Sequence, residues 1–87
     1  MSNLLSLVQK TLDEKLAEDI VTIDIRNVNT YTDYYVICTA KNSRHANSLV
    51  EYVEKEAEKN GYEVLLREGE RDSTWVLIDM NEVVVHI

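Results

Sequence analysis

The chain has 87 residues, enough for a single small domain (residues 1–87), and this length excludes a deep cleft between two domains. Its formal net charge is −7 and it has no basic patch, so we do not expect direct binding to nucleic acid. The acidic charge either serves solubility or favours a basic protein partner. No apolar run approaches the ~20 residues of a membrane span, and the start of the chain lacks the pattern of a signal peptide. One cysteine allows no internal disulfide, which fits a cytoplasmic protein.

Two elements are predicted in the first third of the chain. Apolar residues at helical spacing predict a helix over residues 2–14. Alternation over residues 19–25 predicts a strand, with Val21, Ile23 and Ile25 on its buried face. The polar stretch 26–33 is typical of a loop.

The middle of the chain predicts a strand, a helix and a second strand. Residues 34–40 are apolar on both faces, which indicates an interior strand. Asn42 or Ser43 caps a helix over residues 44–59, which ends at Asn60-Gly61. Residues 62–67 form the second strand, and the helical crossover makes the two strands parallel.

The last third predicts a β-hairpin. Residues 73–79 and 83–87 are rich in β-branched residues, and a short polar stretch between them forms the turn. The fold class is therefore α/β, a mixed sheet of about five strands in the order αββαβββ. We expect both helices mainly on one face of the sheet, which leaves part of the other face open.

No arrangement of residues in the sequence predicts catalysis. The acidic residues form no convincing pair for metal-assisted chemistry, and His45, His86 and Cys38 lack the spacing of metal ligands. The chain has two glycines and no nucleophile elbow or phosphate loop. We therefore expect no enzyme activity, no metal and no cofactor.

The first strand of the hairpin carries the best candidate for binding. Trp75, Leu77 and Asp79 point to one side, while Val76 and Ile78 point to the other and suit packing under the helices. An aromatic anchor beside an aliphatic residue and a carboxylate is typical of an interface hot spot. The alternative is that Trp75 belongs to the core and Asp79 caps the turn.

Several blocks of sequence together resemble the ribosomal silencing factor (Iojap-like) family over nearly the whole chain. The blocks are Leu12-Asp13-Glu14-Lys15, Ala17-Glu18-Asp19-Ile20, Thr32-Asp33-Tyr34-Tyr35-Val36-Ile37, Ser43-Arg44, Glu68-Gly69, Trp75-Val76-Leu77-Ile78-Asp79 and Val83-Val84-Val85-His86-Ile87. The Trp-x-Leu-x-Asp and Val-Val-His-Ile segments are the most distinctive of them.

The resemblance implies a bacterial or organellar translational repressor. Such a factor docks on the large ribosomal subunit through its protein fourteen and blocks joining of the small subunit when nutrients are scarce. It also implies a nucleotidyltransferase-like fold without the metal-binding acids, and a homodimer in the free state. The residues expected at the docking site are Trp75, Leu77, Asp79, Glu68, Gly69, Glu70, Tyr34 and His86.

Two departures from the family pattern remain. Family members usually continue past the His-Ile pair, so we expect a truncated or short form in which the edge of the last strand is exposed. The turn Met80-Asn81-Glu82 also replaces an aromatic-Gly-Asp type of turn. The alternatives to a repressor are a nucleotidyltransferase-like enzyme and a dimerising adaptor with no ribosomal role.

Overall fold

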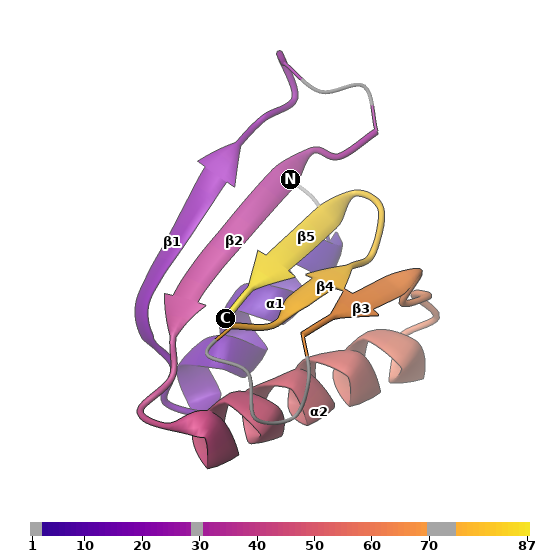
Figure 1. Ribbon diagram of the computed structural model, residues 1–87. Coiled ribbons are helices and arrows are strands. Elements are labelled where there is room, and N and C mark those ends of the chain that lie inside the picture. The colour runs from indigo at the N-terminus through magenta and orange to yellow at the C-terminus, as the bar shows by residue number, and fades with distance from the viewer. Residues whose placement is uncertain (1–2, 29–30, 70–74) are drawn as a thin grey trace.

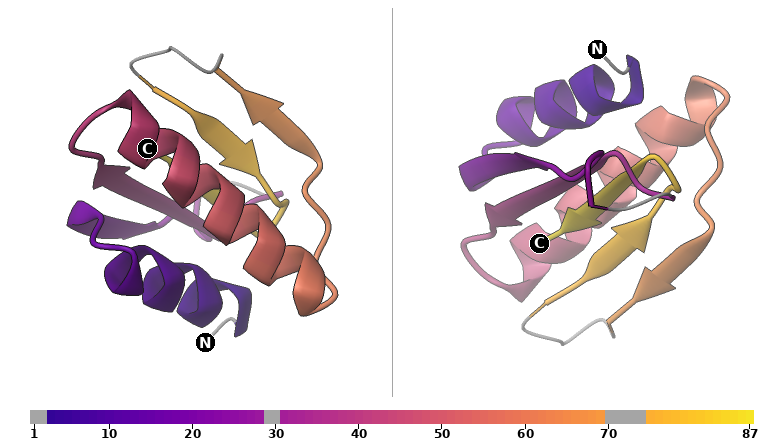
Figure 2. Two further views of the ribbon diagram at one scale, coloured as in Figure 1. Left: turned by 90° about the horizontal axis from the view of Figure 1, so that it is seen from below. Right: turned by 90° about the horizontal axis from the view of Figure 1, so that it is seen from above.

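A computed structural model describes residues 3–28, 31–69 and 75–87. Its helices and strands follow the predicted order αββαβββ. They are α1 (Asn3–Glu14), β1 (Glu18–Asp24), β2 (Tyr34–Thr39), α2 (Ser43–Lys59), β3 (Leu66–Glu68), β4 (Leu77–Asp79) and β5 (Val83–His86). Both helices lie on one side of a single sheet, and the other side carries no helix of the described chain (Figures 1 and 2). The predicted α/β fold class is confirmed.

The helices are formed by amphipathic sequences whose apolar stripes meet the sheet. The core joins side chains of α1 and α2 to those on the covered side of the strands, among them Leu4, Leu12, Leu49, Val36, Ile78 and Val85. Asn42 caps α2, because its side-chain oxygen accepts a hydrogen bond from the His45 N–H at 2.8 Å. Gly61 follows the helix at φ +86°, a conformation that glycine adopts without strain. The second helix therefore ends at Lys59 as predicted and begins at Ser43, one residue before the predicted start.

The strands lie in the order β1-β2-β5-β4-β3. β2 and β5 are parallel, and the other neighbouring pairs are antiparallel. β2 and β3 run in the same direction, as predicted, but β5 and β4 lie between them. The hairpin of β4 and β5 is confirmed, although residues 73 and 74 of its predicted first strand lie outside the described residues. The expectation of an exposed last strand is wrong, since β5 has a partner on each side.

The prediction for β1 placed its apolar residues on the wrong face. Val21 is 51% exposed and Ile23 is 43% exposed, whereas Thr22 faces α1 and accepts a hydrogen bond from Gln9 Nε2 at 2.8 Å. Alternation showed that β1 has one apolar face. It could not show on which side of the sheet the two helices would pack.

The predicted strand over residues 62–67 is also corrected. Regular pairing with β4 covers only Leu66–Glu68, because β4 itself has three residues. Tyr62 and Val64 still pack against the core, but from an extended segment ahead of β3. In the described part of the chain, no helix is long and apolar enough to cross a bilayer.

Candidate docking surface

The uncovered side of the sheet presents two rows of side chains, which we call the open face. Residues paired directly across neighbouring strands point to the same side of a sheet. The strand register therefore gives one row of Val21, Ile37, His86, Leu77 and Glu68, and a second row of Ile23, Tyr35, Val84, Asp79 and Leu66. Trp75 lies two residues before Leu77, so it points to the same side and lies next to the first row, on the side away from the second. Most members of the open face are apolar, and the two acids lie on β3 and β4.

Trp75 is the largest side chain on the open face. Its side chain is 44% exposed, whereas its neighbour Val76 is buried under the helices. Val76 exchanges two backbone hydrogen bonds with Ile87, at 2.8 and 3.1 Å, and these bonds fix the strand on which Trp75 stands. The expected alternation of Trp75, Leu77 and Asp79 against Val76 and Ile78 is confirmed by burial. Trp75 is thus not a core tryptophan.

His86 lies beside Trp75 on the open face. The indole and imidazole rings meet edge to face, with centroids 6.0 Å apart and an interplanar angle of 81°. The other side of the imidazole meets Tyr35, with a hydrogen bond of 3.2 Å between Tyr35 Oη and His86 Nδ1. The polar end of His86 therefore has the partner that a half-buried histidine requires.

The end of β3 approaches the backbone of Trp75. Gly69 has φ +104°, and a Cβ at this position would lie 2.5 Å from the Trp75 carbonyl oxygen and 3.0 Å from the Val76 Cα. Only glycine fits so close to another segment of backbone. Glu68 precedes it and points to the open face opposite Leu77. Glu70, also expected at the docking site, lies outside the described residues.

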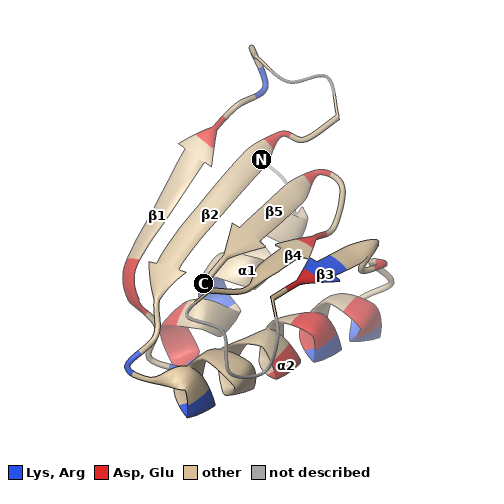
Figure 3. Cartoon of the chain, viewed as in Figure 1, with Lys and Arg blue, Asp and Glu red and all other residues tan. Residues whose placement is uncertain are grey.

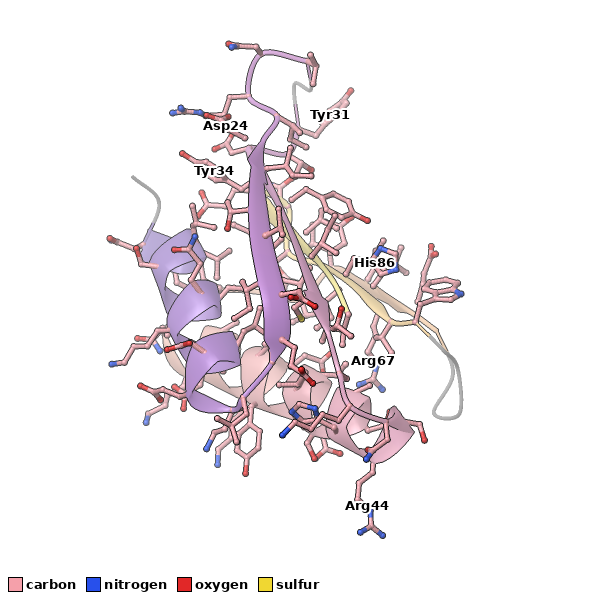
Figure 4. All side chains as sticks on the ribbon, turned by 90° about the vertical axis from the view of Figure 1, so that its left-hand side faces the viewer. Asp24, Tyr31, Tyr34, Arg44, Arg67 and His86 are labelled. Atoms are coloured by element: carbon pink, nitrogen blue, oxygen red, sulfur yellow. The ribbon has the colours of Figure 1, made fainter. Side chains whose placement is uncertain are left out.

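Asp79 and Tyr34 have local structural roles as well. Asp79 Oδ1 accepts a hydrogen bond from the Asn81 N–H at 2.9 Å, so this carboxylate supports the β4–β5 turn while it remains half-buried on the open face. Tyr34 is buried in the core cluster, and Figure 4 shows Tyr34 and His86 on opposite sides of the sheet. The structure therefore brings together Trp75, Leu77, His86 and Glu68, and it places Tyr34 apart from them.

Three residues of the open face were absent from the predicted site. Tyr35, Val21 and Ile23 come from β1 and β2, far from the hairpin in sequence. The alternation in β1 correctly indicated that Val21 and Ile23 share one face. They were left out of the site because that face was assumed to be buried. Tyr35 carried a weaker signal, because a strand that is apolar on both faces does not reveal which tyrosine points to which side.

Charged side chains lie mainly around the open face and not across its centre. Figure 3 shows no charged residue in the middle of β1, β2 or β5, and it shows acids near strand ends and in the turns. Some of these charges are already paired. Asp24 and Arg26 form a bidentate ion pair with a shortest N–O distance of 2.6 Å, which lowers the pKa of the Asp24 carboxyl. Arg67 contacts Glu54 of α2 at 3.2 Å on the covered side of the sheet.

The described residues offer little for catalysis. Among residues 3–28, 31–69 and 75–87, no group of three or more His, Cys, Asp or Glu could hold a metal ion. Cys38 is buried, and burial raises the pKa of its thiol to about 11, so the reactive thiolate is scarce at neutral pH.

Comparisons of the sequence with known proteins match one family along the whole chain. The profile of the family "Ribosomal silencing factor during starvation" matches residues 1–87. The ribosomal silencing factor of Bacillus subtilis is 31% identical over 85 residues, which cover 98% of this chain and 72% of that protein. The factor of Haemophilus influenzae is 32% identical and covers 97% of this chain and 82% of its own length.

Two solved structures have a fold similar to that of this chain. A crystal structure from Bacillus halodurans has a TM-score of 0.88 and 31% identity, covering 95% of this chain and 77% of that chain. One from Chromobacterium violaceum has a TM-score of 0.90 and 25% identity, covering 99% of this chain and 73% of that chain. The match of profile, relatives and fold over the whole length is decisive, and the chain belongs to the ribosomal silencing factor family.

Proposed function

We propose that this protein represses translation by docking its open face on the large ribosomal subunit, where it blocks joining of the small subunit. The docking partner is the subunit's protein fourteen, and the setting is the bacterial cytoplasm under nutrient limitation. The mechanism is steric, so no bond is made or broken and no cofactor or metal takes part. The observation that carries the proposal is the largely apolar open face with the exposed Trp75 beside it.

The physical argument starts from exposed apolar area. A sheet face with Val21, Ile23, Leu66 and Trp75 between 43% and 51% exposed is an unusual surface to leave in water. Covering it with a partner removes that area from water and provides the driving force for docking. The indole of Trp75 has the size and position of an anchor residue.

The charge around the open face favours a basic partner. Glu68 and Asp79 lie on the open face, and the net charge of the chain is −7. Such a field draws a basic surface towards the face and raises the rate of encounter more than the final affinity. The apolar centre then supplies most of the affinity, and the acids supply orientation.

The first test is co-sedimentation with isolated large ribosomal subunits. Trp75→Ala should weaken docking by at least ~2 kcal/mol, roughly thirtyfold or more, because an anchor residue loses most of its contact area. Ile78→Val is a control three residues further along the chain, since this small change lies on the covered side of the sheet. Circular dichroism must show that both variants are folded.

The second arm adds small subunits to the mixture. The wild-type protein should reduce the yield of joined ribosomes, and Trp75→Ala should restore that yield. A folded Trp75→Ala variant that docks and blocks as well as the wild type would remove the open face from the mechanism. Docking without any loss of subunit joining would overturn the steric mechanism, and no docking of the wild-type protein would leave the adaptor alternative.

A further inference from the structure

Three rings lie on one diagonal across the open face. Tyr35 is on β2, His86 on β5, and Trp75 just before β4. Ile37 is paired with His86, and His86 with Leu77, so Tyr35 and Trp75 each lie two residues along their strands from a residue paired with His86. Such diagonal neighbours are within reach of aromatic side chains. His86 thus lies between two rings that come from separate strands.

The contacts along this diagonal form a chain. Tyr35 Oη and His86 Nδ1 are 3.2 Å apart, and the centroids of their rings are separated by 6.3 Å at an interplanar angle of 75°. The imidazole then meets the Trp75 indole at 6.0 Å and 81°. A hydrogen bond at one ring nitrogen restricts rotation of the imidazole about its last side-chain torsion, which is otherwise broad.

We infer that Tyr35 is a positioning residue for docking, which holds His86 so that its ring keeps the Trp75 indole in its docking orientation. This inference rests on the proposed function, because docking gives the orientation of Trp75 its importance. An anchor that is already oriented loses less side-chain freedom on binding. The phenol hydroxyl of Tyr35 should therefore affect affinity without needing to contact the partner.

The chain provides a matched control in the preceding residue. Tyr34 is buried on the covered side of the sheet (Figure 4). The adjacent Tyr35 pairs with Ile23 and Val84 and is half-buried on the open face. Tyr35→Phe and Tyr34→Phe remove the same single hydroxyl from opposite sides of β2. The inference expects docking to change only with Tyr35→Phe.

The first readout is the fluorescence of Trp75, the only tryptophan in the chain. In the free protein, Tyr35→Phe should lower the steady-state anisotropy of the indole and change its emission, and Tyr34→Phe should do neither. A general loss of stability could also change the fluorescence of Trp75. Thermal unfolding is therefore measured first, and the two variants should unfold at the same temperature. Unchanged Trp75 fluorescence in Tyr35→Phe would overturn the inference, whatever the ribosome experiments give.

The second readout is a double-mutant cycle on docking. Tyr35→Phe should weaken docking about fivefold, the size of one ordinary hydrogen bond. In a His86→Phe background, which keeps a ring but has no nitrogen to form the hydrogen bond, Tyr35→Phe should have no further effect. A fivefold loss that persists in this background would mean that Tyr35 acts directly, and the inference would be wrong.

The two proposals fail in different ways. If Trp75→Ala does not weaken docking, the open face is removed from the mechanism and Tyr35 has no role in docking, while the fluorescence of Tyr35→Phe still shows whether Tyr35 positions the Trp75 indole. If Trp75→Ala weakens docking and Tyr35→Phe does not, the proposed function stands and the positioning role is rejected.

Discussion

Leu16 occupies a backbone conformation that usually requires glycine. It follows α1 at φ +66°, and two hydrogen bonds close the helix around it, from Leu16 N–H to the Asp13 carbonyl and from Ala17 N–H to the Leu12 carbonyl. This is the Schellman arrangement, in which the position of Leu16 is normally glycine because a Cβ is strained there. The side chain of Leu16 is 65% exposed, so burial compensates little of the strain.

Leu16→Gly should therefore stabilise the protein. Relief of the left-handed strain exceeds the entropy that glycine adds to the unfolded chain, and we expect a net gain of about 0.5–1 kcal/mol. Urea unfolding should show a higher midpoint with an unchanged slope. Leu16→Ala keeps the Cβ and should give no gain. An equal gain from both variants would attribute the effect to the exposed leucine side chain and not to the backbone.

At the residue scale, the sequence located some site residues and missed others for a physical reason. Trp75 and Leu77 were predicted because alternation along one strand is a local property. The contact of Tyr35 with His86 depends on how β2 and β5 align, and about half of the chain lies between these strands. The sequence could not show which side chains of β2 point to the open face, because that depends on the side of the sheet on which the two helices pack.

At the scale of elements, the connection from β3 to β4 controls where Trp75 stands. Gly69 has the positive φ that favours glycine, and a Cβ there would meet the backbone of Trp75 at 2.5 Å. Backbone cannot move aside as a flexible side chain can. Gly69→Ala should therefore displace either the end of β3 or the strand that carries Trp75.

The expected result of Gly69→Ala is a loss of both stability and docking. We predict a destabilisation of about 2 kcal/mol or more, from strain and overpacking together, and weaker co-sedimentation with large subunits. Gly61→Ala is the matched control, because Gly61 also has positive φ but a Cβ there meets nothing within 4 Å. It should cost about 1 kcal/mol and leave docking of the folded protein unchanged. Equal docking by the two folded variants would contradict the role given to Gly69.

The element order was predictable because helices and strands differ in the period of their apolar residues, and α1, α2 and the hairpin followed that signal. Strand extent was not. Residues 62–65 have the composition of a strand, yet regular pairing begins only at Leu66, since the length of β3 depends on its partner β4. The apolar face of β1 was recognised, but its direction depended on packing of the whole molecule.

At the scale of the whole molecule, the five strands and two helices leave one large surface uncovered. The helices cover only one side of the sheet, and no described segment of the chain lies over the other side (Figure 2). In the free protein, two open faces can cover each other about a twofold axis. Self-association and docking would then use the same surface, and a protein docked on the ribosome would be a monomer.

This reasoning predicts a dimer of the free protein that one surface charge disrupts. Val21 lies on the open face at 51% exposure, and Val28 lies in the β1–β2 connection, away from the described strands, at 84% exposure. Analytical ultracentrifugation at tens of micromolar should give a dimer for the wild type and for Val28→Glu, and a monomer for Val21→Glu, because an open-face contact would bury the new carboxylate without a partner. The two variants carry the same change of residue and charge, so added net charge cannot explain a difference between them. A wild-type monomer at this concentration would argue against self-association, and a dimer that survives Val21→Glu would place the contact on another surface, such as the outer edge of β3.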